Sequence, residues 1–442
     1  MIKVRFAPSP TGQLHVGNVR IAILNYLFAR NNGGSFVLRI DDTDTERSTK
    51  ESENLIIEDL KWLGIEWDEF HRQSARFGRY DEVIEYLKKI GRLYPCYETK
   101  EELSLKRKIQ SSQGIPPVYD REALRLTDEQ IRRYEEEGRR PYWRFKLNEK
   151  EVVEWEDLVH GKIAIPLSSV SDPVLTKPDG GYVYTLASVV DDIDMGITHI
   201  IRGDDHITNT AVQSNMFMAI SGACPNFGHL PLMSSLDGAD ISKRTSSPLS
   251  IVNMRKEGIE PMAIWNILAM LGTANNSNPD FTIDDLIEKF SFEKRSLAAV
   301  KFNMEDVRGL TKKIIAKKSF AEVKDSLEVQ NLSHATEEFW CTIRDNVRNI
   351  NEAAHWHRIF FGKIDTPPQD KNFVQQMLDA FAPDFDDWIA NLKKISQRKG
   401  RNLFHPIRMV LTGEENGPEL KKIFNLIGPE QVKNRIKQNL EA

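Results

Sequence analysis

One stretch near the N-terminus constrains the fold more than any other part of this 442-residue chain. It reads RFAPSPTGQLHVGNVRIAILNYLFAR over residues 5–30. Alternating polar and apolar residues at 2–6 predict a strand, which Pro8 and Pro10 then end, because proline fixes φ and lacks an N–H donor. From 16 to 30 apolar residues recur at helical spacing on nearly every side, which predicts a buried helix.

The junction between this loop and the helix is a candidate phosphate site. His15 and Gly17 stand where the loop meets the predicted helix N-terminus. Free backbone N–H groups and the positive end of the helix dipole gather there, and a glycine lets a phosphate chain approach closely. A histidine that merely caps the helix would look the same, so this motif alone does not decide between the two interpretations.

Strand and helix patterns alternate further along the chain. Residues 36–40 predict a strand that ends in an acidic cluster at 41–44, and Ser48 with Glu51 predicts a capping box for a helix that Gly64 ends. This alternation predicts an α/β fold with a parallel, doubly wound, Rossmann-type sheet. Ligands bind such sheets at the carboxyl ends of the strands, where the proline loop and the acidic cluster both lie.

Two breaks in the pattern predict the domain organisation. The segment from about 95 to 180 is rich in charge and broken by prolines, which predicts an α+β insertion. From about 255 onward almost every segment has helical spacing, and no strand signal there would support a β-barrel. The predicted domains are a Rossmann-type catalytic domain of residues 1–95 and 181–250, an insertion of 96–180, a helical domain of 251–305 and an all-α region of 306–442.

Composition excludes several classes of protein. Charged residues make up 28% of the chain, and no apolar run approaches the ~20 residues of a membrane span, so we expect a cytoplasmic protein without membrane contact. The three cysteines are far apart, which excludes a disulfide framework and an all-cysteine zinc site. The net charge of −5 gives no sign of nucleic-acid binding, so any such surface must be a local basic face.

A second candidate phosphate element lies far downstream. ISKRTSS places Lys243 and Arg244 among small hydroxyl residues in a predicted loop, where a lysine can bind a pyrophosphate as charge builds on it. Alone, such a triplet is usually a solvated surface loop. A histidine–x–glycine at one helix start, followed much later by a serine–lysine pair, has the order and separation of the HIGH and KMSKS signatures of class I aminoacyl-tRNA synthetases.

The chain resembles bacterial-type glutamyl-tRNA synthetases along nearly its whole length. The stretches that carry the resemblance are residues 5–30, 36–48, 72–99, 187–210, 229–244 and 399–420. It implies a ligase that attaches L-glutamate to the 3′ end of tRNA, first forming glutamyl-adenylate from ATP and then transferring the acyl group to the terminal adenosine. It also implies Mg²⁺ with the ATP, and tRNA(Glu), with or without tRNA(Gln), as partner of a monomeric enzyme.

The resemblance further implies roles for individual residues. Those expected to bind the glutamate substrate are Arg5, Ala7, Ser9, Asp41, Tyr184 and Arg202. Those expected to bind ATP or take part in catalysis are His15, Gly17, His206, Ser242, Lys243 and Arg244. A guanidinium is the natural partner of a carboxylate, and Arg5 is assigned to the substrate side chain. The plain alternatives are a surface salt bridge to Asp204 or Asp205 for Arg202, and core packing for Tyr184.

The chain departs from the family pattern in two places. Asp240 stands where the family has its first signature lysine, and Thr245 and Ser246 replace His-Gly. Such a loss of charge would slow activation by roughly 10²-fold unless Arg244 compensates. Cys96 lacks the further cysteines that hold zinc in many relatives, so we expect a packed thiol, no zinc and no other protein-bound metal.

Two alternative functions stay open at this point. The altered lysine signature would suit a catalytically weak, tRNA-binding paralogue. A glutaminyl-tRNA synthetase has a similar core, but Arg5 favours a carboxylate substrate and such enzymes carry β-barrels in the C-terminal half. The basic residues that we expect to contact tRNA there, with a solvated face as an equal alternative, are Arg398, Lys399, Arg401 and Arg408.

Overall fold

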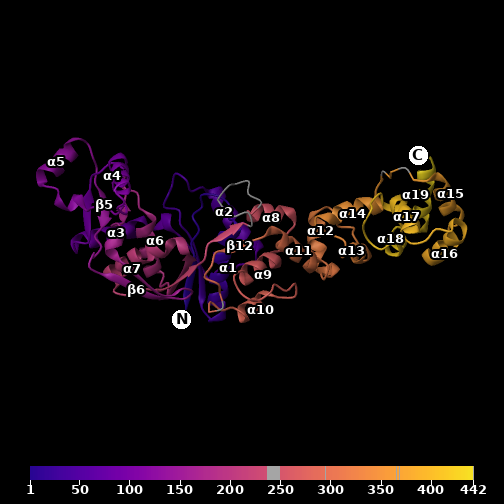
Figure 1. Cartoon of the computed structure of the whole chain (residues 1–442), viewed down its shortest axis with the longest axis horizontal. Helices are drawn as coiled ribbons and strands as arrows, with labels where there is room; N and C mark the ends of the chain where they lie inside the picture. Colours follow the sequence, from indigo (N-terminus) through magenta and orange to yellow (C-terminus); the bar gives the residue numbers. More distant parts are fainter. Residues whose placement is uncertain (236–248, 294, 365, 368, 442) are drawn as a thin grey trace. The chain divides into compact units, whose positions relative to one another are not determined.

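The computed structural model describes residues 1–441 except 236–248, 294, 365 and 368 (Figure 1). The chain divides into two compact units. The first consists of Met1–Asn253, Trp265–Ser277 and Phe281–Asn303, and the second of Met254–Ile264, Asn278–Asp280 and Met304–Ala442.

A parallel sheet forms the centre of the first unit. Its strands are β1 (Lys3–Phe6), β2 (Ser35–Ile40), β3 (Glu69–Arg72), β9 (His199–Gly203) and β10 (Asn226–Leu230). β1, β2 and β3 pair in parallel, as do β9 and β10. The Thr198 N–H donates to the Lys3 carbonyl at 2.9 Å and so joins β9 to β1. The strand order β3-β2-β1-β9-β10 confirms the predicted doubly wound sheet.

Helices cover this sheet in the predicted alternation. They are α1 (Val16–Asn31), α2 (Lys50–Trp62), α3 (Phe77–Lys89), α6 (Tyr184–Asp194) and α7 (Ile207–Ser221). α1 is buried on nearly all sides, as its sequence predicts. No helix in the part of the chain that the structure describes is long and apolar enough to cross a bilayer.

The predicted capping box of α2 is wrong by one residue. Thr49 is the N-cap, and its side chain accepts a hydrogen bond from the Ser52 N–H at 3.1 Å. The Ser48 N–H instead donates to the Asp44 carbonyl at 2.9 Å and closes the preceding turn. Thr49 has the extended backbone that an N-cap requires, so it takes the position that Ser48 was expected to fill.

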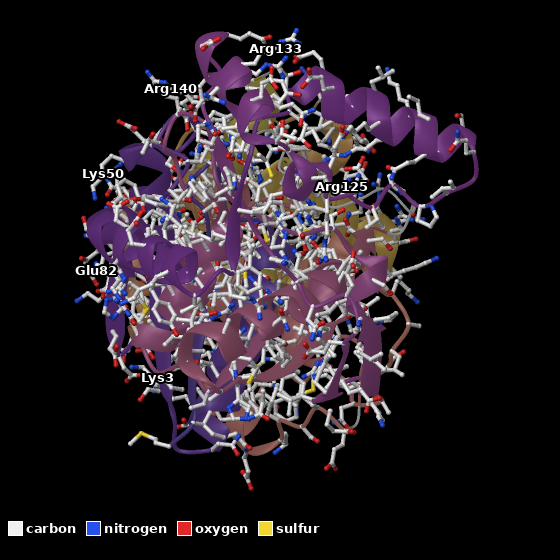
Figure 2. The ribbon with its side chains drawn as sticks, turned by 90° about the vertical axis from the view of Figure 1, so that its left-hand side faces the viewer. Lys3, Lys50, Glu82, Arg125, Arg133 and Arg140 are labelled. Carbon is white, nitrogen blue, oxygen red and sulfur yellow. The ribbon has the colours of Figure 1, made fainter. Side chains whose placement is uncertain are left out.

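The segment between the two halves of the sheet has the expected α+β character. It contains β4 (Leu93–Cys96), α4 (Lys100–Ser112), α5 (Asp128–Glu136), β5 (Tyr142–Phe145), β6 (Val152–Asp157), β7 (Gly161–Pro166) and β8 (Val174–Thr176). β4, β5 and β8 form a small antiparallel sheet. Figure 2 shows the exposed Arg125, Arg133 and Arg140 at the outside of this region.

The hairpin of β6 and β7 belongs to the main sheet rather than to a separate body. β6 pairs with β7 in antiparallel fashion and with β10 in parallel, with Asp157 opposite Phe227. A segment that the sequence assigns to the insertion therefore extends the edge of the α/β sheet. Asp157, the last residue of β6, is buried against β10, which pairs with β9.

Shorter elements follow the second half of the sheet. They are β11 (Met233–Ser235), α8 (Ile251–Glu257), α9 (Pro261–Met270), α10 (Ile283–Glu288) and β12 (Val300–Phe302). β12 lies in the region that we expected to be helical and pairs in parallel with β11. Three residues are too few to show a strand period, so only the pairing reveals this strand.

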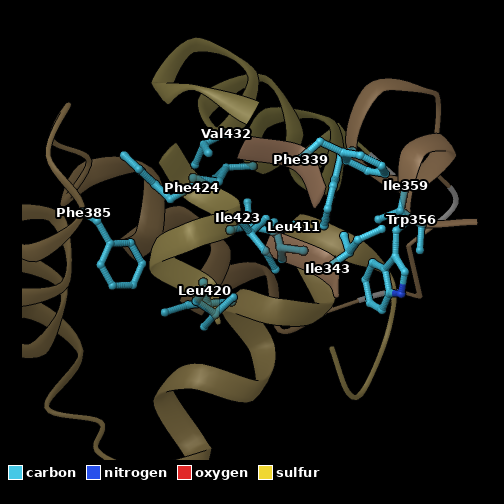
Figure 3. Packing of buried hydrophobic residues seen from close by; sticks show 14 of the residues in the cluster. Phe339, Ile343, Trp356, Ile359, Phe385, Leu411, Leu420, Ile423, Phe424 and Val432 are labelled. Carbon is cyan, nitrogen blue, oxygen red and sulfur yellow. The ribbon is translucent and has the colours of Figure 1, made fainter. Parts of the chain in front are cut away.

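Beyond Phe302, all the regular secondary structure in the described residues is helical. The helices of the second unit there are α11 (Met304–Ile315), α12 (Phe320–Val329), α13 (Glu337–Ile343), α14 (Glu352–Phe361), α15 (Lys371–Asp379), α16 (Phe385–Ser396), α17 (Arg401–Thr412), α18 (Leu420–Ile427) and α19 (Pro429–Glu441). Their apolar faces meet in one core, where Phe339, Trp356 and Phe424 are buried (Figure 3).

A buried arginine ties two helix ends of this unit together. Arg435 is 2% exposed and donates to the Ile359 and Phe360 carbonyls at 2.7 and 2.8 Å and to the Leu411 carbonyl. These carbonyls lie in the last turns of α14 and α17. Carbonyls at that position have no hydrogen-bond partner within their own helix. Burial lowers the pKa of Arg435 to about 10, and the group stays charged.

A substitution at Gly417, between α17 and α18, tests how Trp356 packs in the core of the second unit. The φ of Gly417 is +155°, and a Cβ there would collide with the buried indole of Trp356. We expect Gly417→Ala to lower the free energy of unfolding by about 2–3 kcal/mol, through backbone strain and a displaced Trp356. Denaturant unfolding followed by circular dichroism measures the change.

Gly309→Ala provides the matched control. Gly309 lies inside α11, and a Cβ there would meet nothing within 4 Å. Alanine should therefore stabilise this helix by about 0.5–1 kcal/mol. Equal unfolding free energies for the two variants would contradict the packing described for Trp356.

Candidate active site

A cavity of about 530 Å³ opens at the carboxyl ends of β1 and β9 in the first unit. Its walls are the loop between β1 and α1, the first turn of α1, the start of α6, and the segments after β9 and β10. The predicted site residues that line it are Arg5, Ala7, Ser9, His15, Gly17, Tyr184, Arg202 and His206. The predicted Ser242, Lys243 and Arg244 lie outside the described residues, as do Asp240, Thr245 and Ser246.

The two residues of the first signature fit each other closely. His15 is the N-cap of α1, and its Nδ1 accepts a hydrogen bond from the Gly17 N–H at 3.1 Å. A Cβ on Gly17 would stand 2.9 Å from the His15 ring, so glycine is required at this position. The capping interpretation is thus correct in geometry, and it places the imidazole on the cavity wall at a helix N-terminus.

Arg5 reaches the cavity from β1 and is held from behind. It is 4% exposed, and its Nε donates to Asp192 Oδ1 at 3.1 Å. Asp192, on α6, also accepts from Arg39 Nη1 at 2.7 Å. Because Asp192 takes the Nε of Arg5, a ligand in the cavity can be contacted by the terminal nitrogens of the guanidinium.

Asp41 contacts Arg39 and is not among the described residues that line the cavity. Arg39 is fully buried and binds both carboxylate oxygens of Asp41, at 2.6 and 3.1 Å. The predicted contact of Asp41 with substrate stays a prediction, while the observed contact positions Arg39. Burial raises the pKa of Asp41 to about 6 even with Arg39 against it.

Arg39 and Asp192 stay ionised through mutual pairing. Burial alone would lower the pKa of Arg39, but Asp41 and Asp192 hold it well above its ordinary value. Burial alone would likewise raise the pKa of Asp192, but Arg5 and Arg39 hold it below its ordinary value. Our sequence reasoning missed Arg39 and Asp192, although charged residues inside the apolar stretches SFVLRI and LASVVDD were an available signal.

Arg202 has buried donors that no group among the described residues satisfies. It is 5% exposed and lines the cavity, and its Nη2 donates to Thr210 Oγ1 at 2.6 Å. Its Nε and Nη1 have no hydrogen-bond partner among the described residues. Burial lowers its pKa. A carboxylate in the cavity would satisfy these donors, whereas a surface salt bridge to Asp204 or Asp205 is not the arrangement found.

His206 and Tyr184 form an aromatic part of the cavity wall. Their ring centroids are 6.0 Å apart. Burial, together with the charge of Arg202, lowers the pKa of His206 to about 4, so the imidazole is neutral at physiological pH. A neutral imidazole beside a phenol ring can contact a flat aromatic ligand without adding a buried charge. Tyr184 lines the cavity, and its contact with substrate stays a prediction.

Arg20 is a further cavity residue that sequence reasoning missed. It is on α1, is 4% exposed, and its Nη1 donates to the Pro231 carbonyl at 2.7 Å. This bond attaches the segment after β10 to the first helix. Burial lowers the pKa of Arg20 to about 10. The signal was a charged residue in the middle of a largely apolar helix.

Cys96 is a packed thiol, as predicted. It is buried beside the Tyr119 hydroxyl, with the sulfur and oxygen 3.6 Å apart. Burial raises its pKa to about 12, so the thiolate form that zinc requires is disfavoured. Within residues 1–441, apart from the undescribed positions, no group of three or more His, Cys, Asp or Glu could hold a metal ion.

Two of the four basic residues expected to contact tRNA are engaged within the second unit. Arg398 pairs with Asp370 at 2.6 Å, and Arg408 donates to the Pro418 carbonyl at 2.8 Å. Lys399 and Arg401 are exposed. Their contact with tRNA stays a prediction.

Comparisons with known proteins show the family of this chain. Residues 1–309 match the family of class I tRNA synthetases (E and Q), catalytic domain, and residues 337–440 match an anticodon binding domain. A glutamate–tRNA ligase 2 of Bartonella bacilliformis is 46% identical over 99% of this chain and 100% of its own length. One of Hyphomonas neptunium is 46% identical over 98% and 99%.

Solved structures give the same result. A glutamate tRNA ligase of Elizabethkingia meningosepticum, in complex with its amino acid, superposes with a TM-score of 0.86 at 27% identity, covering 100% of this chain and 99% of that one. A glutamate-tRNA synthetase of Elizabethkingia anophelis does so with a TM-score of 0.84 at 28% identity, covering 100% of both chains. The chain therefore belongs to the class I tRNA synthetase family whose catalytic domain serves glutamate and glutamine (E and Q).

Proposed function

We propose that this protein is a glutamate–tRNA ligase that binds L-glutamate, ATP and tRNA. The observation that carries the proposal is the pair of buried arginines, Arg5 and Arg202, that face one cavity. Glutamate has two carboxylates, and two guanidinium groups with unused donors suit both of them. The relatives named above, which match over their full length, support the same assignment.

In the first step, an oxygen of the glutamate α-carboxylate attacks the α-phosphorus of ATP, and pyrophosphate leaves. Arg5 and Arg202 hold the amino acid, while His15 and the N-terminus of α1 bind the phosphates. Lys243 neutralises the charge that develops on pyrophosphate. We expect Mg²⁺ to enter with the ATP phosphates, whose oxygens are the ligands that it prefers, and no step here depends on a protein-bound metal.

In the second step, a ribose hydroxyl of the terminal tRNA adenosine attacks the activated carbonyl carbon, and AMP leaves. Both steps rely on positioning and charge neutralisation, and no protein nucleophile is needed. We assign the acceptor end of tRNA to residues 96–180, its stem to 251–305 and its anticodon to 306–442. The monomeric state and the cytoplasmic location also stay predictions.

Two observations bear on the alternative functions. A glutaminyl enzyme would place a neutral amide against the terminal nitrogens of Arg5, where a carboxylate forms the stronger, charge-assisted hydrogen bonds. Beyond Phe302 the described residues contain no strand from which a β-barrel could form. A catalytically weak paralogue is suggested only by Asp240, Thr245 and Ser246, for which Arg244 compensates in our proposal.

Lys243 of the lysine signature provides a test of the proposed catalysis. Lys243→Ala should lower the rate of glutamate charging by roughly 10²- to 10³-fold, because one group that stabilises transition-state charge is lost. Aminoacylation is measured with purified tRNA(Glu) and tRNA(Gln) side by side. Lys301→Ala, at an exposed lysine of β12, is the matched control and should charge at the wild-type rate.

The two tRNAs separate the remaining possibilities. Charging of tRNA(Glu) alone means a discriminating ligase, whereas charging of tRNA(Gln) means that an amidotransferase must correct the product. Absence of glutamate charging on both tRNAs by folded wild-type protein would overturn the proposal and favour the weak paralogue. Charging with glutamine in place of glutamate would favour the glutaminyl enzyme.

A further prediction concerns Arg202. Arg202→Lys should raise the KM for glutamate by about 10- to 100-fold, because lysine keeps the charge but loses the planar set of donors. The KM for ATP should change little. Arg79→Lys is the control, since Arg79 forms only partly exposed ion pairs with Glu82 and Asp194. A lower melting temperature with an unchanged KM for glutamate would show that Arg202 is structural.

A further inference from the structure

A chain of buried hydrogen bonds runs from the β6–β7 hairpin to the cavity. Asp157 Oδ2, at the end of β6, lies 2.6 Å from His229 Nδ1 on β10. His229 Nε2 lies 2.8 Å from Thr210 Oγ1 on α7. Thr210 Oγ1 in turn accepts from Arg202 Nη2 at 2.6 Å. All four residues are at most 5% exposed.

The order of donors along this chain follows from its two ends. A guanidinium only donates, so Thr210 accepts from Arg202. Asp157 accepts the Nδ1–H of His229, so a neutral imidazole has its lone pair at Nε2 and accepts from the Thr210 hydroxyl. Every proton then points from the cavity toward Asp157. Asp157 sets the tautomer of His229 in this arrangement. The Thr210 hydroxyl also lies 3.3 Å from the His206 carbonyl, a second acceptor, and the shorter contact of 2.8 Å favours His229.

Asp157 is well suited to anchor the chain. It also accepts the backbone N–H groups of Val159 at 3.0 Å, His160 at 3.1 Å and His229 at 3.1 Å. Burial alone would raise its pKa, but these bonds and His229 lower it to about 2, so the carboxylate is ionised throughout the physiological range. The anchor therefore stays an acceptor under all working conditions.

We propose that Asp157, His229 and Thr210 are positioning residues, which hold the Arg202 guanidinium in the orientation that binds a substrate carboxylate. The hydroxyl of Thr210 accepts from Nη2 of Arg202, and the Tyr184 side chain also interacts with this guanidinium. Nε and Nη1 have no partner among the described residues within hydrogen-bond geometry, and we assign them to a ligand. Without the Thr210 hydroxyl, the long side chain could turn toward the carboxylates after β9. This inference rests on the proposed role of Arg202 in glutamate binding.

The turn of the same hairpin makes a second contact with the cavity wall. His160 Nε2 lies 2.9 Å from Asp204 Oδ1, in the short helical turn that presents His206 to the cavity. The β6–β7 hairpin thus supports both Arg202 and the turn beside it. The β6–β7 hairpin interrupts the α/β fold in sequence, but its side chains contact the residues that hold Arg202 and the Asp204–His206 turn in place.

The test is a double-mutant cycle in the full-length enzyme. Thr210→Val removes the hydroxyl at nearly constant shape, and we expect the KM for glutamate to rise about tenfold or more, because a hydrogen bond to a charged group is lost. The KM for ATP should stay within about twofold, because the hydroxyl contacts only the backbone carbonyl of His206, at 3.3 Å, and not its imidazole. Thr210→Ser keeps the hydroxyl and should restore nearly wild-type values. In the Arg202→Lys background, Thr210→Val should add little, because no guanidinium remains to be oriented.

Controls make the outcomes distinct. Thr311→Val removes another buried threonine hydroxyl, in the second unit, and should leave both KM values unchanged. Two results would overturn the proposed relay, that is, the hydrogen-bond chain from Asp157 to Arg202. One is an equal rise in the KM for glutamate and the KM for ATP in Thr210→Val, and the other is full additivity of the effects of Thr210→Val and Arg202→Lys on the KM for glutamate. If Arg202→Lys itself leaves the KM for glutamate unchanged, the proposed role of Arg202 has failed instead.

A second variant covers the case in which Thr210→Val does not fold. Asp157→Asn keeps the shape of the anchor but can present an amide N–H to His229. We expect the same selective rise in the KM for glutamate, smaller than that of Thr210→Val. An unchanged KM for glutamate in folded Asp157→Asn protein would contradict the relay.

Discussion

The pairing of Arg39 with carboxylates on two different segments is the constraint on which the rest of the site depends. Arg39 is inaccessible to solvent, and it binds Asp41 just beyond β2 and Asp192 on α6. Removing such ions from water costs several kcal/mol each, which is recovered only when every partner is in place. β2, α6 and Arg5 on β1 are therefore held in one arrangement, and Arg5 faces the cavity as a result.

In the function proposed here, the cavity combines two kinds of recognition. Buried guanidinium groups favour an anionic amino acid, while His15 at the start of α1 and the neutral His206 suit the phosphates and the base of a nucleotide. The proposed reaction needs no protein nucleophile. A reaction between a carboxylate and a phosphate needs alignment and neutralised charge above all, and rigid buried arginines supply both without reorganising during the reaction.

Local signals made much of the fold predictable. The alternation in β1, the prolines after it and the apolar α1 each depend on neighbours a few residues away, and the structure confirms them. The N-cap of α2 was predicted at Ser48, but it is Thr49. The two adjacent hydroxyl residues compete for this position, and Ser48 instead closes a turn with the Asp44 carbonyl. β12 was missed because its pairing with β11, not its own three residues, makes it a strand.

The sequence by itself determined the family, the order of elements and eight of the residues that line the cavity, because these depend on short motifs in a set order. Only the tertiary structure decided what holds those residues. Arg39 meets Asp192 across 153 positions, and Asp157 meets His229 across 72. No local pattern marks such pairs. Each forms because a buried charge must find a partner, and the packing of distant strands and helices determines which partner is within reach.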